Sequence, residues 1–141
     1  MTTQPRPEGV TWVSPYLTVK DADLAVDFYE NAFKFEKRDM VPGQDGTTWH
    51  AEVKYKDQLL MLGKEGVWGG KTLSPQTSKI ESPMNLYLYC EDVDAFYKHA
   101  VAHGAESVGQ PEDMFWGDRM CRLQDPDGYV WCFATFKGEH K

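Results

Sequence analysis

Apolar and polar residues recur along the first half of the chain in patterns that predict a strand, a helix and three further strands. The expected elements are a strand over residues 10–19, a helix over 22–33, a short strand over 35–40 and a hairpin over 47–62. Pro15 lies inside the first strand and indicates an edge position or a bulge. Asp21 is a suitable N-cap for the helix. The apolar face of this helix is expected to hold Leu24, Phe28 and Phe33.

The second half shows the same order of patterns. Its expected elements are a strand over residues 84–90, a helix over 93–103, a short strand over 106–110 and a strand over 116–123 that leads into a final strand ending at 132. Asp92 is the expected N-cap of the helix. The last two strands are joined by Asp125-Pro126-Asp127-Gly128, in which Pro sets φ and Gly supplies a positive φ, so a tight turn is expected.

The two halves are an internal repeat. Matched residues lie 71 positions apart: Tyr16 and Tyr87, Asp21 and Asp92, and Met61 and Cys132. The sequence therefore predicts an α+β fold of two tandem βαβββ modules in a single domain. We expect module one at about 10–63, a linker over 64–83 and module two at about 84–136.

The predicted linker is rich in Gly, Ser, Lys and Pro. A connection of this length inside a compact domain is typical of a disordered or a functional loop. Trp68 lies among glycines in this segment. We expect it to be a lid or an interface anchor or, alternatively, an indole packed on the protein surface.

Strand alternation predicts that the two sheets form a cup with the helices outside, and it assigns side chains to each face. The side chains expected under the helices are Leu17, Val19, Ala51, Val53, Leu86, Leu88, Val130 and Phe133. The side chains expected to face the cup are Ser14, Tyr16, Thr18, His50, Glu52, Lys54, Met61, Asn85, Tyr87 and Tyr89. A concave, polar and aromatic face is by default a small-molecule site, and the alternative is an ordinary solvated sheet face.

Charge and cysteine content narrow the classes of function. The chain has 141 residues and a formal net charge of −7, which argues against binding of a nucleic-acid backbone. Its three scattered cysteines predict neither a disulfide framework nor a Cys-x-x-Cys zinc motif, so a reducing, cytoplasmic location is expected. The first nine residues lack the apolar core of a signal peptide, and no apolar run is long enough to span a membrane. We therefore expect neither a nucleic acid nor a membrane as partner.

Six motifs carry a family resemblance that covers nearly the whole chain. They are Tyr16-Leu-Thr-Val-Lys-Asp21, Asp27-Phe-Tyr-Glu-Asn-Ala-Phe33, His50-Ala-Glu52, Tyr89-Cys-Glu-Asp-Val-Asp94, Phe115-Trp-Gly-Asp-Arg119 and Asp125-Pro-Asp-Gly128. With them the sequence resembles the vicinal-oxygen-chelate superfamily, also called the glyoxalase/bleomycin-resistance/dioxygenase fold, and in particular its PhnB-like or glyoxalase-like branch. The resemblance implies a homodimer. It leaves the reaction open, because the superfamily includes isomerases, dioxygenases, epimerases, thiol transferases and drug-sequestering proteins.

The resemblance also implies four positions at which metal-dependent members of the superfamily hold a divalent ion. In this sequence they are Ser14, Met61, Asn85 and Cys132. Other members place His, Gln or Glu there, whereas Ser, Asn and Met are poor ligands for a hard divalent ion and only Cys132 is a good donor. We therefore expect no metal at these positions and no cofactor, and we expect Met61, Asn85 and Cys132 to line the cup.

Four residues outside these positions are candidates for chemistry. His50 and Glu52 lie two apart on one strand and are expected to form an acid–base pair, a displaced metal site or a surface pair joined by one hydrogen bond. Arg119 is expected either to anchor an anionic ligand or to form a salt bridge with Asp118 or Glu112. Trp116 is expected either to stack on a ligand or to pack beside a helix.

The leading hypothesis is a metal-free protein that binds a small aromatic or amphipathic molecule in the cup, as drug-sequestering members of the family do. The expected ligand contacts are Tyr16, His50, Glu52, Met61, Asn85, Tyr87, Tyr89, Trp116, Arg119 and Cys132. The rival hypothesis is a glyoxalase-like lyase or isomerase, or a dioxygenase, that uses a displaced divalent metal or His50 and Glu52 as acid–base groups. A third possibility is a dimer whose cup has lost its chemistry.

Overall fold

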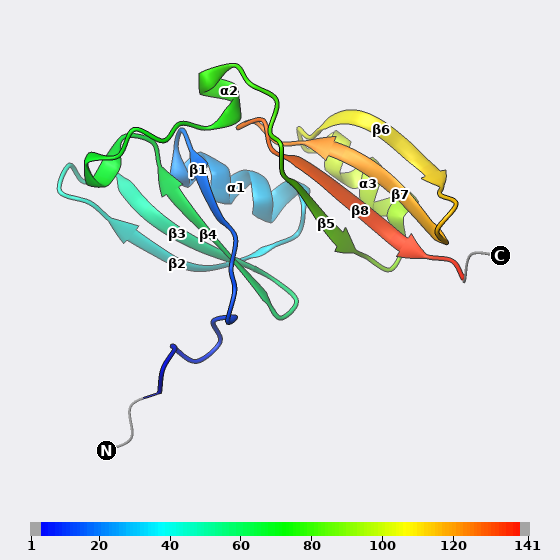
Figure 1. Ribbon diagram of the computed structural model, residues 1–141, viewed down its shortest axis with the longest axis horizontal. Helices are drawn as coiled ribbons and strands as arrows, with labels where there is room; N and C mark the ends of the chain where they lie inside the picture. The colour runs from blue at the N-terminus through cyan, green and yellow to red at the C-terminus, as the bar shows by residue number, and fades with distance from the viewer. Residues whose placement is uncertain (1–3, 139–141) are drawn as a thin grey trace. The chain divides into compact units, whose positions relative to one another are not determined.

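The computed structural model describes residues 4–138, which form two compact units, each with one four-stranded sheet (Figure 1). The first unit takes the chain up to Glu30 together with Lys34–Ser74, and the second takes Asn31–Phe33 together with the chain from Pro75 onward. The boundary between Ser74 and Pro75 falls inside the predicted linker.

The sheet of the first unit has the strand order β1-β4-β3-β2. Its elements are β1 (Tyr16–Val19), α1 (Ala22–Ala32), β2 (Glu36–Pro42), β3 (Thr48–Tyr55), β4 (Gln58–Lys64) and the short 3₁₀ helix η1 (Val67–Gly69). Strand β1 runs parallel to β4, and the other neighbours are antiparallel.

The sheet of the second unit has the equivalent order β5-β8-β7-β6. Its elements are α2 (Pro75–Ser78), β5 (Asn85–Tyr89), α3 (Val93–Ala102), β6 (Glu106–Asp113), β7 (Asp118–Gln124) and β8 (Val130–Phe136). Strand β5 runs parallel to β8, and the other neighbours are antiparallel. The α+β fold of two βαβββ modules predicted from the repeat is therefore confirmed.

Local signals in the sequence set the ends of these elements. The side chain of Asp21 accepts a hydrogen bond from the Leu24 backbone N–H at 3.0 Å, and Asp92 accepts one from Ala95 at 3.1 Å, so both predicted N-caps are formed. In the predicted turn, the Asp125 carboxylate accepts from the backbone N–H groups of Asp127 and Tyr129 at 2.9 and 3.1 Å, and Gly128 has a φ of 92°.

Two predictions about the first unit were wrong. The first strand begins at Tyr16 rather than at residue 10, because Pro15 has no N–H to donate and because Thr11 and Ser14 bond each other through their hydroxyls at 2.7 Å. On α1 the predicted apolar face is also wrong, because Leu24 is 67% exposed. The buried stripe is Ala22, Ala25, Val26 and Tyr29, and successive residues of a helix turn by about 100°, so Leu24 points away from this stripe.

The core of the second unit is aromatic. The Phe33 ring packs on Phe133 and Trp131 with centroids 4.8 and 5.5 Å apart, and Phe96 of α3 stacks on Phe133 at 4.2 Å. Phe133 therefore lies on the helix side as predicted. Val130 was assigned to the same side, but it is three residues away and the strand period is two, so it lies on the opposite face.

The predicted linker contains ordered elements. It includes the last residue of β4, the 3₁₀ helix η1 and the short helix α2, where the Gln76 N–H donates to the Asp127 carbonyl at 2.9 Å. Within residues 4–138, no helix has the length and apolar character needed to cross a membrane.

Candidate functional site

In the first unit, a chain of hydrogen-bonded side chains crosses the sheet from β1 to β2. The Tyr16 hydroxyl lies 3.2 Å from His50 Nδ1, and His50 Nε2 lies 2.9 Å from Glu52 Oε2. The other oxygen of Glu52 accepts from Arg38 of β2. In the neutral imidazole, Nε2–H donates to the Glu52 carboxylate, which leaves Nδ1 to accept from the Tyr16 hydroxyl.

Strand pairing and one glycine bring this chain together. Tyr16 and Glu52 both pair with Met61 of β4, so these three predicted site residues share one face of the sheet. His50 pairs with Gly63, and the Tyr16 ring lies over this glycine, since a Cβ at residue 63 would be 2.6 Å from Tyr16 Cε1. Partial burial raises the pKa of Tyr16 above its ordinary value, so its hydroxyl remains a proton donor at neutral pH.

Gly63 was not identified from the sequence. The repeat nevertheless contained a signal, because Gly63 and Ala134 lie 71 positions apart and are both small. A small residue on the central strand at this position leaves room for a side chain from the edge strand to cross the sheet.

A pocket of about 220 Å³ lies beside Tyr16. It is formed by Tyr16, Thr18, Gly63 and Lys64 of the sheet and by Val67, Trp68 and their flanking loop residues. Lys64 Nζ is already held by Thr47 Oγ1 at 2.8 Å and lies 3.8 Å from Asp45 Oδ2, so its charge is balanced. The pocket therefore offers two aromatic side chains and little net charge.

Trp68 is supported by Trp49 of β3, which is held in turn by the loop between β2 and β3. Its ring contacts Trp49 edge-on, with centroids 5.0 Å apart and an interplanar angle of 87°. The Trp49 indole N–H donates to Asp45 Oδ1 at 2.9 Å, and its ring lies on Gly43, where a Cβ would be only 2.0 Å from Trp49 Cδ2. Hydrogen bonds from Thr47 and Trp49 lower the pKa of Asp45 to about 2. Trp49, Asp45 and Gly43 were not predicted as site residues.

Trp68 itself has an uncommon backbone conformation. Its φ of 58° lies in the left-handed region, and its side chain is 70% exposed. Such a conformation costs free energy for a residue other than Gly, and an exposed indole gains little from packing in the free protein. The combination is typical of a residue that is kept for binding.

In the second unit, three predicted ligand contacts converge on a carboxylate that the sequence analysis did not single out. The hydroxyls of Tyr87 and Tyr89 donate to Asp118 Oδ2 at 2.5 and 2.9 Å, and the Trp116 indole N–H lies 3.1 Å from the same oxygen. Burial and the hydrogen bond to Asp118 raise the pKa of Tyr87 to about 12. The hydrogen bond to Asp118 likewise raises the pKa of Tyr89. Asp118 had been considered only as a salt-bridge partner of Arg119.

The predicted partners of Arg119 were wrong. Its guanidinium bonds Asp94 at 2.8 and 3.1 Å and Asp113 at 3.2 Å, not Asp118 or Glu112. Alternation along β7 points Arg119 away from the face of Asp118 and towards the first turn of α3, where Asp94 lies. The hydrogen bonds to Asp94 and Asp113 raise the pKa of Arg119 further above its ordinary value. Arg119 is therefore not grouped with Tyr87, Tyr89 and Trp116.

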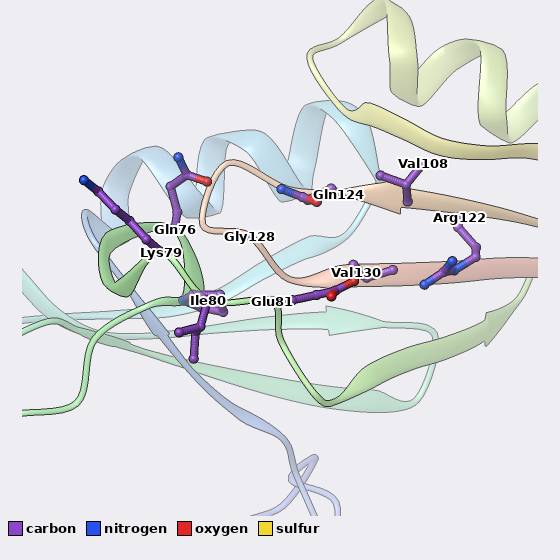
Figure 2. Close-up of a pocket in the computed structure, with 10 residues that line it drawn as sticks. Gln76, Lys79, Ile80, Glu81, Val108, Arg122, Gln124, Gly128 and Val130 are labelled. Atoms are coloured by element: carbon purple, nitrogen blue, oxygen red, sulfur yellow. The ribbon is translucent and has the colours of Figure 1, made fainter.

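A larger pocket of about 500 Å³ lies on the second unit near the Asp125–Gly128 turn (Figure 2). Residues of the predicted linker line it together with residues of β6, β7, β8 and the turn before β8. They are Pro75, Gln76, Lys79, Ile80, Glu81, Val108, Arg122, Gln124, Gly128 and Val130. Figure 2 shows Lys79 directed away from Arg122, while Glu81 and Arg122 point towards Val130. This pocket has no aromatic lining and includes none of the predicted site residues.

The four family metal positions do not fit a hard divalent ion. Ser14 bonds Thr11, and Met61 offers a thioether. Asn85 is an exposed amide at the start of β5, and Cys132 is buried with Met120 and Ala134, which raises the pKa of its thiol. Among residues 4–138, no group of three or more His, Cys, Asp or Glu side chains is arranged to hold a metal.

Comparison with known proteins identifies the family. The model of the glyoxalase/bleomycin resistance protein/dioxygenase superfamily matches residues 9–133, and the chain belongs to this superfamily. An uncharacterized protein of Mycobacterium bovis is 39% identical over 121 residues, which cover 84% of this chain and 79% of the relative.

Two solved structures illustrate the range of the fold. TioX from Micromonospora sp. ML1 has a TM-score of 0.71 and 25% sequence identity, covering 89% of this chain and 98% of that protein. The fosfomycin resistance protein FosX from Listeria monocytogenes, whose structure contains Mn(II) and sulfate, has a TM-score of 0.67 and 14% sequence identity. The match covers 89% of this chain and 90% of that protein. At this low identity FosX shares the fold alone. The PhnB-like branch stays a prediction.

Proposed function

We propose that the protein binds a small aromatic or amphipathic molecule in the pocket between Tyr16 and Trp68, without a metal ion. The observation that carries the proposal is the exposed Trp68, held by Trp49 beside a pocket whose other aromatic side chain is Tyr16. Two aromatic side chains with little net charge favour a flat, uncharged group. Sequestration of a drug-like molecule is one use of such a site.

The volume of the pocket limits the size of the ligand. About 220 Å³ lies between the cavity of about 150 Å³ that holds benzene and the lower end, about 300 Å³, of pockets for drug-sized ligands. We therefore expect one aromatic ring with short substituents, or the aromatic end of a longer amphipathic molecule.

The hydrogen-bonded chain supplies polar recognition at the edge of this pocket. Tyr16 is the member that both lines the pocket and contacts His50. A ligand carbonyl or hydroxyl that replaces His50 as its partner would gain a donor whose position is fixed by Gly63 below it. Ligand orientation is therefore assigned to Tyr16, with His50, Glu52 and Arg38 as positioning residues.

A thermal-shift panel of aromatic compounds tests the proposal. A ligand at 100 times its Kd should stabilise the protein by about 2.7 kcal/mol. The shift should vanish in Trp68→Ala and Gly63→Ala and remain in Trp12→Ala, a matched control in which another exposed indole outside the pocket is removed. If no aromatic compound raises the melting temperature, or if Trp68→Ala responds like the wild type, the proposal is wrong.

A second candidate function is acid–base catalysis by His50, the rival hypothesis from the sequence. The observation that favours it is that both ring nitrogens are engaged, one by Glu52 and one by the hydroxyl of Tyr16, a residue that lines the pocket. Glu52 would hold the tautomer, and Nδ1 would take the proton of a substrate hydroxyl in place of Tyr16. Mass spectrometry of the recovered ligand separates the two functions, since a binding protein returns it unchanged.

The homodimer implied by the family resemblance stays a prediction, which analytical ultracentrifugation tests.

A further inference from the structure

A group of exposed aromatic side chains lies at one end of the second sheet and is here called the aromatic platform. Its members are Tyr87, Tyr89, Phe115, Trp116 and Phe136, of which Tyr87, Tyr89 and Trp116 are 42%, 53% and 41% exposed. The arrowheads of β5 and β8 and the turn from β6 to β7 meet at this end (Figure 1). Exposed aromatic surface of this extent is typical of a binding site.

The two tyrosine side chains of the platform reach across the sheet. Tyr87 and Tyr89 start on β5, yet their hydroxyls bond Asp118 on β7, so both side chains pass over β8. The β8 residues in register with them are Cys132 and Ala134, which are small enough to let the rings pass. The two rings meet edge to face, with centroids 5.6 Å apart and an interplanar angle of 61°, and both remain partly exposed.

The platform lies over a negative charge that no cation balances. Asp118 is only 2% exposed, and the three groups that bond its Oδ2 are neutral donors. In the part of the chain that the structure describes, no lysine or arginine forms an ion pair with it, and the neighbouring Arg119 is bound to Asp94 and Asp113. The raised pKa values of both tyrosines keep the phenols protonated as donors to Asp118.

This arrangement favours one class of ligand. A phenol that donates to a carboxylate has a more electron-rich ring, and ring faces attract cations. A small, strongly hydrated ion would need the carboxylate itself, which is covered. A large, weakly hydrated organic cation needs only the π-faces and the field of the charge beneath them.

We propose that the aromatic platform is a binding site for a small quaternary ammonium compound or a similar large organic cation. The site lies in the second unit and shares no residue with the pocket between Tyr16 and Trp68, so this inference does not depend on the proposed function.

Choline and its neutral isostere 3,3-dimethylbutan-1-ol provide a matched pair of probes. The readout is the Trp116 indole N–H resonance in ¹H–¹⁵N spectra, assigned with Trp116→Phe. Choline should shift this resonance in a saturable way, and the isostere should bind roughly tenfold more weakly because it lacks the charge. Equal binding of both probes, or no movement of the Trp116 resonance, would overturn the proposal.

Variants test the role of the buried charge. Asp118→Asn should weaken choline binding roughly tenfold, whereas Glu36→Gln, which neutralises an exposed carboxylate on β2 of the first unit, should leave it unchanged. If Asp118→Asn does not fold, Tyr89→Phe keeps the ring, removes one bond to Asp118 and should still weaken choline binding measurably. Wild-type affinity in the folded Asp118→Asn protein, or in Tyr89→Phe when it is the variant used, contradicts the inference.

Discussion

In both modules, tyrosine side chains of an edge strand cross the neighbouring strand, but the residue that they reach differs. In the first, Tyr16 of β1 crosses β4 at Gly63 and reaches His50 of β3. In the second, Tyr87 and Tyr89 of β5 cross β8 at Cys132 and Ala134 and reach Asp118 of β7. Gly63 and Ala134 lie 71 positions apart, as do Tyr16 and Tyr87. The shared fold therefore determines where the tyrosine side chain crosses the sheet. The residue that its hydroxyl reaches determines the charge of the site.

The difference in charge separates the ligands that each module favours. In module one the Glu52 carboxylate at the end of the chain is paired with Arg38. In module two the Asp118 carboxylate has only neutral donors. We therefore assign uncharged aromatic groups to the first site and organic cations to the second. The same fold thus supports two kinds of recognition through a few side chains.

The largest predicted effect is the loss of the carboxylate in module two. Asp118→Ala would leave the two phenol hydroxyls without their acceptor and the Trp116 N–H with the Tyr87 hydroxyl alone, and hydrogen bonds to a charged group are worth about 1.5–3 kcal/mol each before water replaces them. Because the tyrosines are half exposed, we expect a loss of about 2–4 kcal/mol in the free energy of unfolding, measured with urea. Glu52→Ala is the matched variant and should cost about 1 kcal/mol, since Arg38 can be solvated. Equal losses of stability in the two variants would contradict the proposed difference between the modules.

The second-largest predicted effect is at Gly63, where the Tyr16 side chain crosses β4. Gly63→Ala places a methyl group where the Tyr16 ring lies and should cost about 1–3 kcal/mol, with loss of the aromatic-ligand thermal shift. The reciprocal variant Ala134→Gly removes a methyl group from a strand and should cost about 1 kcal/mol with no effect on that shift. Unchanged ligand response in Gly63→Ala would show that the ring does not depend on this glycine.

Alkaline pH should affect the second module first. The pKa of Tyr87 is raised to about 12 in the folded protein, against about 10 for a free phenol. A group with a raised pKa contributes its stability fully below pH 10 and loses it as pH rises towards 12. Tyrosinate absorbance should show a late-titrating tyrosine in the wild type that titrates earlier in Asp118→Asn. An unchanged titration in this variant would contradict the assigned role of Asp118.

Acid should act on the first module with a smaller effect. The pKa of Asp45 is lowered to about 2 by its bonds to Thr47 and Trp49, against about 3.9 for a free carboxyl. A lowered pKa contributes stability above pH 4 that is lost as pH falls towards 2. Asp45→Asn should reduce this part of the acid dependence, followed by Trp fluorescence. If the acid profile is the same in the variant, Asp45 does not support Trp49 as described.

Much of the fold was predictable because its signals are local or repeated. The repeat of 71 residues predicted two βαβββ modules, and Asp21, Asp92 and the Asp125–Gly128 turn marked element ends by bonds to nearby backbone. The start of the first strand was not predictable from strand propensity alone. It depends on whether a neighbouring strand pairs with the residues before Tyr16, which is a property of the tertiary structure.

The candidate site was predictable only in part. Alternation along strands correctly grouped Tyr16, His50 and Glu52 on one face. It did not identify Gly63 or Asp118, because their roles depend on side chains that cross a neighbouring strand. Arg119 was assigned to the wrong partners since adjacent residues of a strand face opposite sides. Trp49 and Asp45 act through Trp68, and a contact between side chains that lie apart in the sequence leaves no periodic signal.

The most direct test follows both sites in one sample. Indole N–H resonances of Trp68 and Trp116 are recorded while an aromatic compound selected by thermal shift, and then choline, is added. The account predicts that the aromatic compound moves the Trp68 resonance and not that of Trp116, and that choline does the reverse. If both ligands move the same indole resonance, the two modules do not differ in the way proposed here.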